Sequence, residues 1–474
     1  MYTGETRAFI GGEFIATANT FALTSPYSGQ VVAQVADCDA SHAQSALEKS
    51  VAAFAWWSKT TAYERAALLK KFHALVLRDE QEIARVIALE MGKPVTEALG
   101  EVRYAAGFIE WYAEEAKRVY GETLSSQFAH KRLFALRQPV GAVYAVTPWN
   151  FPAAMVTRKL APALAAGCTM VLKPAEQSPL TALKLAQLWL EAGGHGDVFQ
   201  VLPTNAPAEV SSVFMRSEQI RKITFTGSTE VGKILTKQAA DTLKRVSMEL
   251  GGHAPYLIFE DADLEQAVRD VVACKFRNAG QTCVCTNRVY VQSSVLEAFS
   301  AKLAQAVARL NIGDPLEPST QIGPLVDAAG LEKVKRHVED ALQKGATVLT
   351  GGAPLEGLMY QPTVLSGVRP DMLILQEETF GPVAPIIAFE SEAEAIAAAN
   401  NTPFGLAAYI WTRDIARAVR VTESLEYGII GLNDAVPSTV QAPFGGVKQS
   451  GYGREGGHWG LDEYLFTKFV SLGI

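Results

Sequence analysis

Long apolar runs and a disulfide framework are both missing from this chain of 474 residues. Its Ala-rich stretches are broken by Arg, Lys, Pro or Gly before they reach the ~18 residues of a membrane-spanning helix, and neither end has the pattern of a signal peptide. Of only five cysteines, three are scattered singly at Cys38, Cys168 and Cys274, which fits a reducing compartment. We therefore expect no membrane partner and a cytoplasmic location.

A block of Lys or Arg is also missing, and the formal net charge is −7. Nucleic-acid binding needs a local cationic surplus, so we expect no nucleic-acid partner, although single basic residues can still serve an anionic small substrate. What the chain does contain is 48% hydrophobic residues and 20% charged ones. At ~100–200 residues per domain, this length and composition predict two or three domains with a large core.

Strand and helix patterns alternate along the chain. Residues 61–91 have apolar positions at helical spacing, and Gly92-Lys93-Pro94 ends that run. Five strands are then predicted at 143–146, 169–172, 198–202, 222–225 and 245–249, with helices near 153–166, 178–191 and 229–240. Strands with intervening helices predict a doubly wound parallel sheet. From about 253 a second α/β domain is predicted, with strands at 256–259, 286–293, 383–389 and 407–412 and a helix near 263–276.

Two segments look like nucleotide motifs. Gly451–Gly456 matches G-x-G-x-x-G, but no apolar strand precedes it, so we do not interpret it as a dinucleotide site. Gly227–Lys233 matches a P-loop up to its lysine, yet Ile234 replaces the hydroxyl residue that would bind magnesium, which disfavours a P-loop nucleotide-binding module. That segment follows a strand and opens a helix, so its free N–H groups can still face a pyrophosphate.

A thiol and a carboxylate stand beside glycines after this region. Cys283 follows Gly280-Gln281-Thr282, and Glu249 precedes Leu250-Gly251-Gly252. Together with the preceding βαβ pattern, these residues indicate covalent thiol chemistry joined to a nucleotide cofactor.

Seven segments resemble NAD(P)-dependent aldehyde dehydrogenases in the order of that family, and the resemblance covers nearly the whole chain. They are Thr147–Pro152, Lys173–Glu176, Phe225–Ser228, Glu249–Gly252, Gly280–Cys283, Glu378–Pro382 and Pro443–Gly446. Within the superfamily, Phe151–Lys159 and Lys275–Cys285 are similar to the succinate-semialdehyde dehydrogenases.

The resemblance implies three catalytic residues. Cys283 would attack the aldehyde, giving a thiohemiacetal that transfers hydride to nicotinamide and leaves a thioester. Glu249 would be the general base that activates water against this thioester, and the Asn150 amide would join the Cys283 N–H in an oxyanion hole. Taken alone, these residues would be an inert cysteine, a solvated carboxylate and a turn asparagine. The presence of all three disfavours a catalytically silent structural relative.

The resemblance also implies a cofactor site and no metal site. Its residues are Thr147, Pro148, Trp149, Lys173, Glu176, Gly227, Ser228, Gly232, Leu250, Glu378 and Phe380. A carboxylate at Glu176 can accept hydrogen bonds from ribose hydroxyls but repels a 2′-phosphate, which favours NAD, with NADP as the alternative. Taken alone, Lys173 would be a surface lysine and Ser228 a helix cap.

Arg158, Arg277 and Ser438 are implied to bind the substrate. Guanidinium groups offer bidentate bonds to a carboxylate, sulfonate or phosphonate, so the predicted substrate is a small aldehyde with a remote anionic group. Succinate semialdehyde is the first choice, and 3-sulfolactaldehyde, phosphonoacetaldehyde and glutarate semialdehyde are the alternatives. Either arginine could instead be a structural ion-pair partner.

The fold implied is α/β and aldehyde dehydrogenase-like, with three parts. These are an NAD-binding domain with a doubly wound parallel sheet at 1–117 and 139–250, an α/β catalytic domain at 251–445, and a small β bridging element at 118–138 and 446–474. The bridging element implies a homo-oligomer, a dimer or a tetramer. Cys283 and Cys285 are either a labile regulatory disulfide or a nucleophile beside a reduced, buried cysteine.

Overall fold

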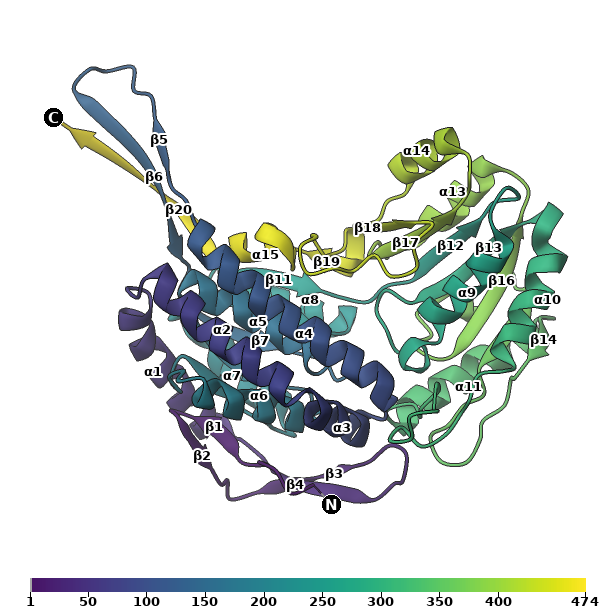
Figure 1. The fold of residues 1–474 in the computed structure, drawn as a ribbon, viewed down its shortest axis with the longest axis horizontal. Coiled ribbons are helices and arrows are strands. Elements are labelled where there is room, and N and C mark those ends of the chain that lie inside the picture. Colours follow the sequence, from purple (N-terminus) through teal and green to yellow (C-terminus); the bar gives the residue numbers. More distant parts are fainter. Residues whose placement is uncertain (1) are drawn as a thin grey trace.

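Two mostly parallel sheets, a projecting antiparallel arm and a short hairpin make up the sheets of the fold (Figure 1). The computed structural model describes residues 2–474. The first sheet has the strand order β19-β11-β10-β7-β8-β9-β1-β2. Its strands are β1 (Ala8–Ile10), β2 (Glu13–Ile15), β7 (Ala142–Val146), β8 (Thr169–Lys173), β9 (Phe199–Val201), β10 (Ile220–Thr226), β11 (Arg245–Glu249) and β19 (Gly451–Tyr452). The five strands from β11 to β9 are parallel, as predicted, and the outer strands are antiparallel to their neighbours.

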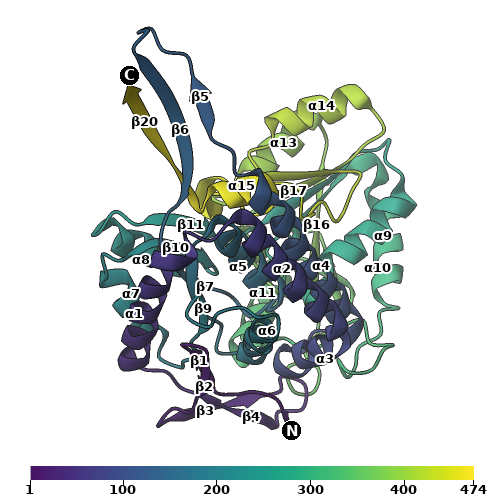
Figure 2. The ribbon, with the colours of Figure 1, turned by 60° about the vertical axis from the view of Figure 1, so that its left-hand side comes forward.

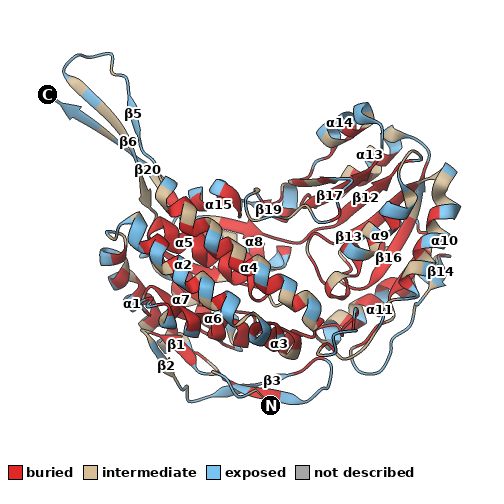
Figure 3. Cartoon of the chain, viewed as in Figure 1, coloured by how far each residue is buried: buried red, intermediate tan, exposed pale blue. Residues whose placement is uncertain are grey.

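Helices cover both faces of this sheet, so its central strands are apolar on both sides. All five residues of β8 are buried, which is typical of a parallel strand between helix layers. The helices are α1 (Ala40–Trp57), α2 (Ala62–Arg78), α3 (Glu80–Met91), α4 (Val95–Glu115), α5 (Ala154–Ala166), α6 (Pro179–Glu191), α7 (Pro207–Arg216), α8 (Thr229–Ala240) and α15 (Gly457–Asp462). One buried cluster joins the sheet to α2–α6, and another joins it to α1, α7 and α8. Figure 3 shows the buried residues of these elements in red.

The second sheet has the order β14-β15-β16-β13-β12-β17-β18 and is parallel except for β14. Its strands are β12 (Ala254–Ile258), β13 (Thr286–Gln292), β14 (Thr347–Thr350), β15 (Thr363–Ser366), β16 (Val383–Phe389), β17 (Ala407–Trp411) and β18 (Ile429–Leu432). Its helices are α9 (Leu264–Lys275), α10 (Leu296–Val307), α11 (Ala328–Gln343), α12 (Leu373–Gln376), α13 (Glu392–Asn400) and α14 (Ile415–Ser424).

An arm of three antiparallel strands projects from the body, as Figures 1 and 2 show. It consists of β5 (Glu122–Leu124), β6 (Lys131–Pro139) and β20 (Leu465–Gly473). Leu465 is the only buried residue of the three strands. A separate hairpin, β3 (Thr20–Thr24) and β4 (Val31–Ala36), lies near the N-terminus.

The strands and helices predicted from the pattern are confirmed to within a few residues, with one difference. The helical run at 61–91 is split at Asp79 into α2 and α3. The Asp79 carboxylate forms ion pairs with Arg78 (2.7 Å) and Lys184 (3.0 Å), which compensates its charge at the break. Within residues 2–474 no helix has the length and apolar composition needed to cross a bilayer.

Candidate active site

The carboxyl ends of the parallel strands bring the predicted site residues to one edge of the first sheet. Strand β7 runs into Thr147–Pro152, β8 ends at Lys173, β10 runs into Gly227, and β11 ends at Glu249. Ligands of open α/β sheets bind at this edge. The Cys283 loop reaches the same edge from the second sheet, because Gly252, which follows β11, lies against the Cys283 carbonyl so closely that a Cβ would collide with it.

Cys283 lies in the turn between the short 3₁₀ helix Arg277–Gly280 and β13. Its thiol is free and half-buried. Burial raises the pKa of this thiol to about 12, and the charge of Arg158 opposes that rise. The thiol is therefore protonated at neutral pH in the protein alone, so an attack on a carbonyl needs a base nearby.

Glu249 is suited to be that base. It is 3% exposed, and neither carboxylate oxygen has a hydrogen-bond partner within residues 2–474. Burial and then the negative charge of Glu455 raise the pKa of Glu249 well above its usual range. A carboxylate with a raised pKa takes up a proton more readily near neutral pH, as general-base catalysis requires.

Glu455 is a buried carboxylate that sequence reasoning did not assign. It forms ion pairs with Arg158 (2.5 Å) and Lys159, and their charges lower the pKa of Glu455 despite its burial. Glu455 belongs to the Gly451–Gly456 segment, which matches G-x-G-x-x-G. In the structure this segment begins with the edge strand β19, which pairs with β11. No spacing in the sequence points to Glu455, since its partners lie on α5.

Asn150 lies in the loop after β7 and is buried. Its Nδ2 donates to the carbonyl of Gln281 (3.2 Å), two residues before Cys283. A side-chain amide carries two N–H donors, so one remains for an oxyanion at the thiol. The structure thus brings Asn150 and the Cys283 loop into direct contact.

The cofactor residues of the β8 and β10 edges form two local pairs. Lys173 is buried and forms an ion pair with Glu176 (2.6 Å), so it is not a free surface lysine. Ser228 caps α8 by accepting a hydrogen bond from the N–H of Val231 (3.3 Å). A Cβ on Gly232 would overlap the Leu250 side chain, so glycine allows α8 to pack closely on this edge.

Glu378 and Phe380, which precede β16 of the second sheet, lie against groups at this edge of the first sheet. Trp149 and Phe380 pack edge to face with ring centroids 5.6 Å apart, and Phe380 has a left-handed backbone (φ 54°). Glu378 accepts a hydrogen bond from the N–H of Gly252 (3.1 Å), and burial raises its pKa to about 7.

NAD(P) fits these groups. The Oγ1 atom of Thr226, at the end of β10, is buried without a partner in residues 2–474, and the start of α8 offers free N–H groups. Glu378 has acceptor capacity left for ribose hydroxyls, and the perpendicular Trp149 and Phe380 rings give this edge an apolar corner.

The predicted substrate residues have unpaired donors. Arg158 Nη2, Arg277 Nε and Ser438 Oγ are buried without a hydrogen-bond partner in the described chain. Both guanidinium charges lower the pKa of the Cys283 thiol against the effect of burial. Arg158 stacks on Phe444 (3.9 Å) and Arg277 lies over Phe151 (5.3 Å).

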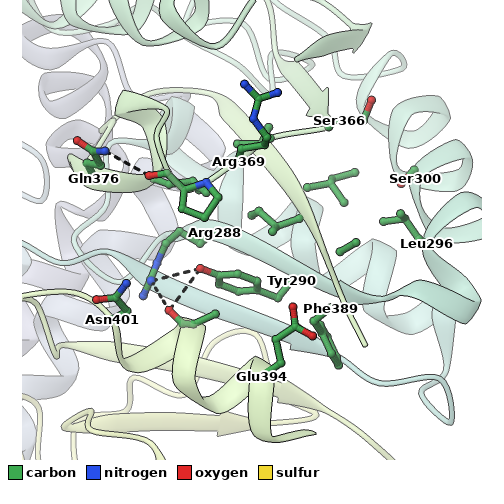
Figure 4. A pocket seen from close by; sticks show the side chains of 18 of the residues that line it. Arg288, Tyr290, Leu296, Ser300, Ser366, Arg369, Gln376, Phe389, Glu394 and Asn401 are labelled. Carbon is green, nitrogen blue, oxygen red and sulfur yellow. Dashed lines mark hydrogen bonds between the residues drawn. The ribbon is translucent and has the colours of Figure 1, made fainter. Parts of the chain in front are cut away.

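A groove elsewhere on the second sheet has a volume of about 1380 Å³ (Figure 4). Arg288, Tyr290, Leu296, Arg369 and Phe389 are among its lining residues, and neither Cys283 nor Glu249 is. The Arg288 guanidinium donates to the carbonyl groups of His253, Ala398 and Ala399 and to the Tyr427 hydroxyl. Because protein oxygen atoms occupy these donors, we assign this groove no part in the reaction.

The family model described as "Aldehyde dehydrogenase family" matches residues 14–470, and the chain belongs to this family. It is an enzyme, an NAD(P)-dependent oxidoreductase of the aldehyde dehydrogenase class.

Two relatives and one solved structure match over almost the full length. The chain is 49% identical to the succinate-semialdehyde dehydrogenase [NADP(+)] GabD of Escherichia coli (strain K12), covering 99% of this chain and 98% of that protein. It is 48% identical to the 3-sulfolactaldehyde dehydrogenase of Pseudomonas putida, covering 98% and 97%. A crystal structure of an NADP-dependent enzyme of E. coli superposes with a TM-score of 0.98 at 48% identity, covering 99% of this chain and 98% of the other.

Proposed function

We propose that this enzyme oxidises succinate semialdehyde to succinate, through a covalent intermediate on Cys283. The choice of an anionic substrate rests on the unpaired buried donors of Arg158, Arg277 and Ser438. Burying a donor without a partner is costly, ~1–3 kcal/mol or more for a charged group, so such a set is suited to an anionic ligand. The relative from E. coli, named for succinate semialdehyde, supports this choice.

The reaction follows from the groups at the edge of the sheet. Glu249 takes the thiol proton as Cys283 Sγ bonds to the aldehyde carbon, and the Asn150 amide and the Cys283 N–H hold the oxyanion. Held by Glu378 and Phe380, a bound nicotinamide cofactor would supply the acceptor for the hydride that leaves this carbon. Glu249, once it has released its proton, then deprotonates a water that attacks the resulting thioester. The C–S bond breaks, the thiolate leaves and the carboxylic acid is released.

NAD is the proposed preferred cofactor, with NADP also accepted. Lys173 and Glu176 would face the adenosine ribose, Gly227 and Ser228 the pyrophosphate, and Glu378 and Phe380 the nicotinamide half. Thr147, Pro148, Trp149, Gly232 and Leu250 would complete the walls. Because Lys173 neutralises Glu176 at 2.6 Å, the repulsion of a 2′-phosphate is weaker than a lone carboxylate would exert.

We propose that the chain divides into the three parts predicted from the sequence and that the arm, which belongs to the bridging element, makes the contacts between subunits. Leu136, Phe469 and Leu472 on β6 and β20 are exposed, Phe469 by 60%, and burying such side chains favours association. We propose a homo-oligomer, a dimer or a tetramer. We also propose a cytoplasmic location. All five cysteines are free, which fits a reducing compartment.

The test is a substrate panel on the purified enzyme. Succinate semialdehyde, glutarate semialdehyde, 3-sulfolactaldehyde, phosphonoacetaldehyde and butanal are compared with NAD and with NADP through the absorbance of the reduced cofactor. The proposal expects the highest kcat/KM for succinate semialdehyde with NAD. A higher kcat/KM for another anionic aldehyde would replace the substrate, and equal values for butanal would remove the anion site.

A further inference from the structure

A buried lysine outside the predicted site touches the Asn150 loop. Lys93 lies between α3 and α4 and is 1% exposed. Its ammonium forms an ion pair with Glu101, donates to the carbonyl of Asn150 (2.7 Å) and lies 3.6 Å from the centroid of the Phe151 ring. One charged group therefore holds the backbone carbonyl of Asn150 and the side chain of Phe151, the next residue of the loop.

Glu101 holds the other end of this loop. Its Oε1 accepts hydrogen bonds from the N–H groups of Ala153 (2.8 Å) and Ala154 (3.2 Å), at the start of α5. The residue at the N-cap of α5 is Ala153, which has no side-chain acceptor of its own. The Glu101 carboxylate, which belongs to α4, thus caps α5 in its place.

Glu97 ties the Cys283 loop to the same helix. It lies one turn before Glu101 and accepts a hydrogen bond from the N–H of Asn278 (2.7 Å), whose backbone is left-handed (φ 50°). The Asn278 side chain in turn donates to the carbonyl groups of Asn150 (3.2 Å) and Gln281 (3.1 Å). Helix α4 therefore contacts both the Asn150 loop and the Cys283 loop. The relative position of these loops sets the distance between the Asn150 amide and the Cys283 thiol.

We propose that Lys93, Glu101 and Glu97 are positioning residues. They hold the Asn150 amide at the position, relative to Cys283, from which it can donate to the oxyanion. This inference rests on the proposed function, because it needs Asn150 as an oxyanion donor. Such donors act only when they stand ~2.7–3.1 Å from the oxyanion. A displacement of ~1 Å can cost ~100-fold in rate. A cluster that serves only the stability of the fold would leave the rate of the folded enzyme unchanged.

A double-mutant cycle between Lys93→Met and Asn150→Ala separates these two roles. The readout is the pre-steady-state burst of reduced cofactor, together with the dissociation constant of NAD. We expect Asn150→Ala to slow the burst by ~100- to 1000-fold and Lys93→Met by ~10- to 100-fold, with NAD affinity unchanged. The double variant should be no slower than Asn150→Ala, because misplacing an amide that is already absent costs nothing. Losses that multiply would overturn the proposal.

Glu90→Gln is the matched control. Glu90 is a buried carboxylate of α3 that caps α6 in the same way, accepting from the N–H groups of Leu180 (2.7 Å) and Thr181 (3.2 Å). It should lower the melting temperature without slowing the burst, and an equal slowing in both variants would refute the positioning role. Should Lys93→Met fail to fold, Glu101→Gln takes its place in the cycle.

Failure of the proposed function gives a different result. If wild type forms no reduced cofactor with succinate semialdehyde, the substrate is wrong, and the cycle is run with the aldehyde of the panel that reacts. If wild type forms no reduced cofactor with any aldehyde of the panel, both the proposed function and the positioning role are refuted. A normal wild-type reaction with a multiplicative cycle refutes the positioning role and leaves the proposed function standing.

Discussion

Arg277 and Arg158 differ in their protein contacts, so replacing each by methionine should have different consequences. Arg277 forms no ion pair with a carboxylate in the described chain, and its Nε has no partner. Arg158 forms an ion pair with Glu455, which in turn raises the pKa of Glu249. Methionine retains most of the length of arginine and removes only the charge and its hydrogen bonds.

The magnitude for Arg277→Met follows from the bond it would lose. A hydrogen bond to a charged group contributes ~1.5–3 kcal/mol, or ~10- to 100-fold in kcat/KM for an aldehyde that carries a carboxylate. Butanal has no anionic group and should change little. For Arg158→Met we expect a loss with both aldehydes, because the charge that lowers the pKa of Glu249 disappears and the base becomes more strongly protonated.

The assay is kcat/KM for succinate semialdehyde and for butanal, measured for wild type and both variants at fixed NAD and pH. Thermal unfolding of each variant controls for folding, since removing one member of a buried ion pair can cost ~3–5 kcal/mol. Equal losses for both aldehydes in Arg277→Met would mean that Arg277 supports the Cys283 loop rather than the substrate. The anion-site reasoning would then be refuted.

Three further predictions concern the cofactor and the second cysteine. Burial raises the pKa of Glu378 to about 7, so NAD affinity should rise as the pH increases through that value and the carboxylate ionises; Glu378→Gln should abolish this dependence in a binding titration. Glu176→Ser should raise kcat/KM with NADP relative to NAD, and an unchanged ratio would exclude Glu176 from cofactor choice. In the structure both Cys283 and Cys285 are free, and the Cys285 thiol donates to the carbonyl of Lys275 (3.5 Å). If the two thiols can form a disulfide, peroxide should inactivate wild type and dithiothreitol should restore its activity. The same reversible loss of activity in Cys285→Ala would reject that disulfide.

Local patterns predicted the first sheet well. Val143–Val146 and Thr169–Leu172 are short apolar runs between turn residues, and both are central parallel strands buried between helices. Flanking glycines drew attention to Glu249 and Cys283, and the resemblance to the aldehyde dehydrogenases supplied the role of Asn150 and the catalytic roles of all three residues. The structure then brings the Asn150 amide to within 3.2 Å of the Gln281 carbonyl.

Contacts between distant segments could not be predicted in this way. Glu455 and Lys159 are 296 residues apart and meet only when β19 lies beside β11. Lys93 was interpreted only as part of a helix end, because its contact with the Asn150 carbonyl depends on the packing of α4 against α5. The break at Asp79 was missed because the apolar spacing continues through it, while the ion pairs that accompany the break include Lys184 on α6.

The covalent intermediate on Cys283 is the central claim, and Glu249→Gln tests it most directly. An amide cannot accept a proton from the thiol or from water, so this variant should form the thioester more slowly than wild type, through the small thiolate fraction, and should hydrolyse it more slowly still. Mixed with succinate semialdehyde and NAD, it should show a succinyl group on the peptide that contains Cys283 by mass spectrometry, and Cys283→Ala should show neither the adduct nor a burst. Reduced cofactor formed without an adduct on Cys283, or turnover of Cys283→Ala within about tenfold of wild type, would contradict the account.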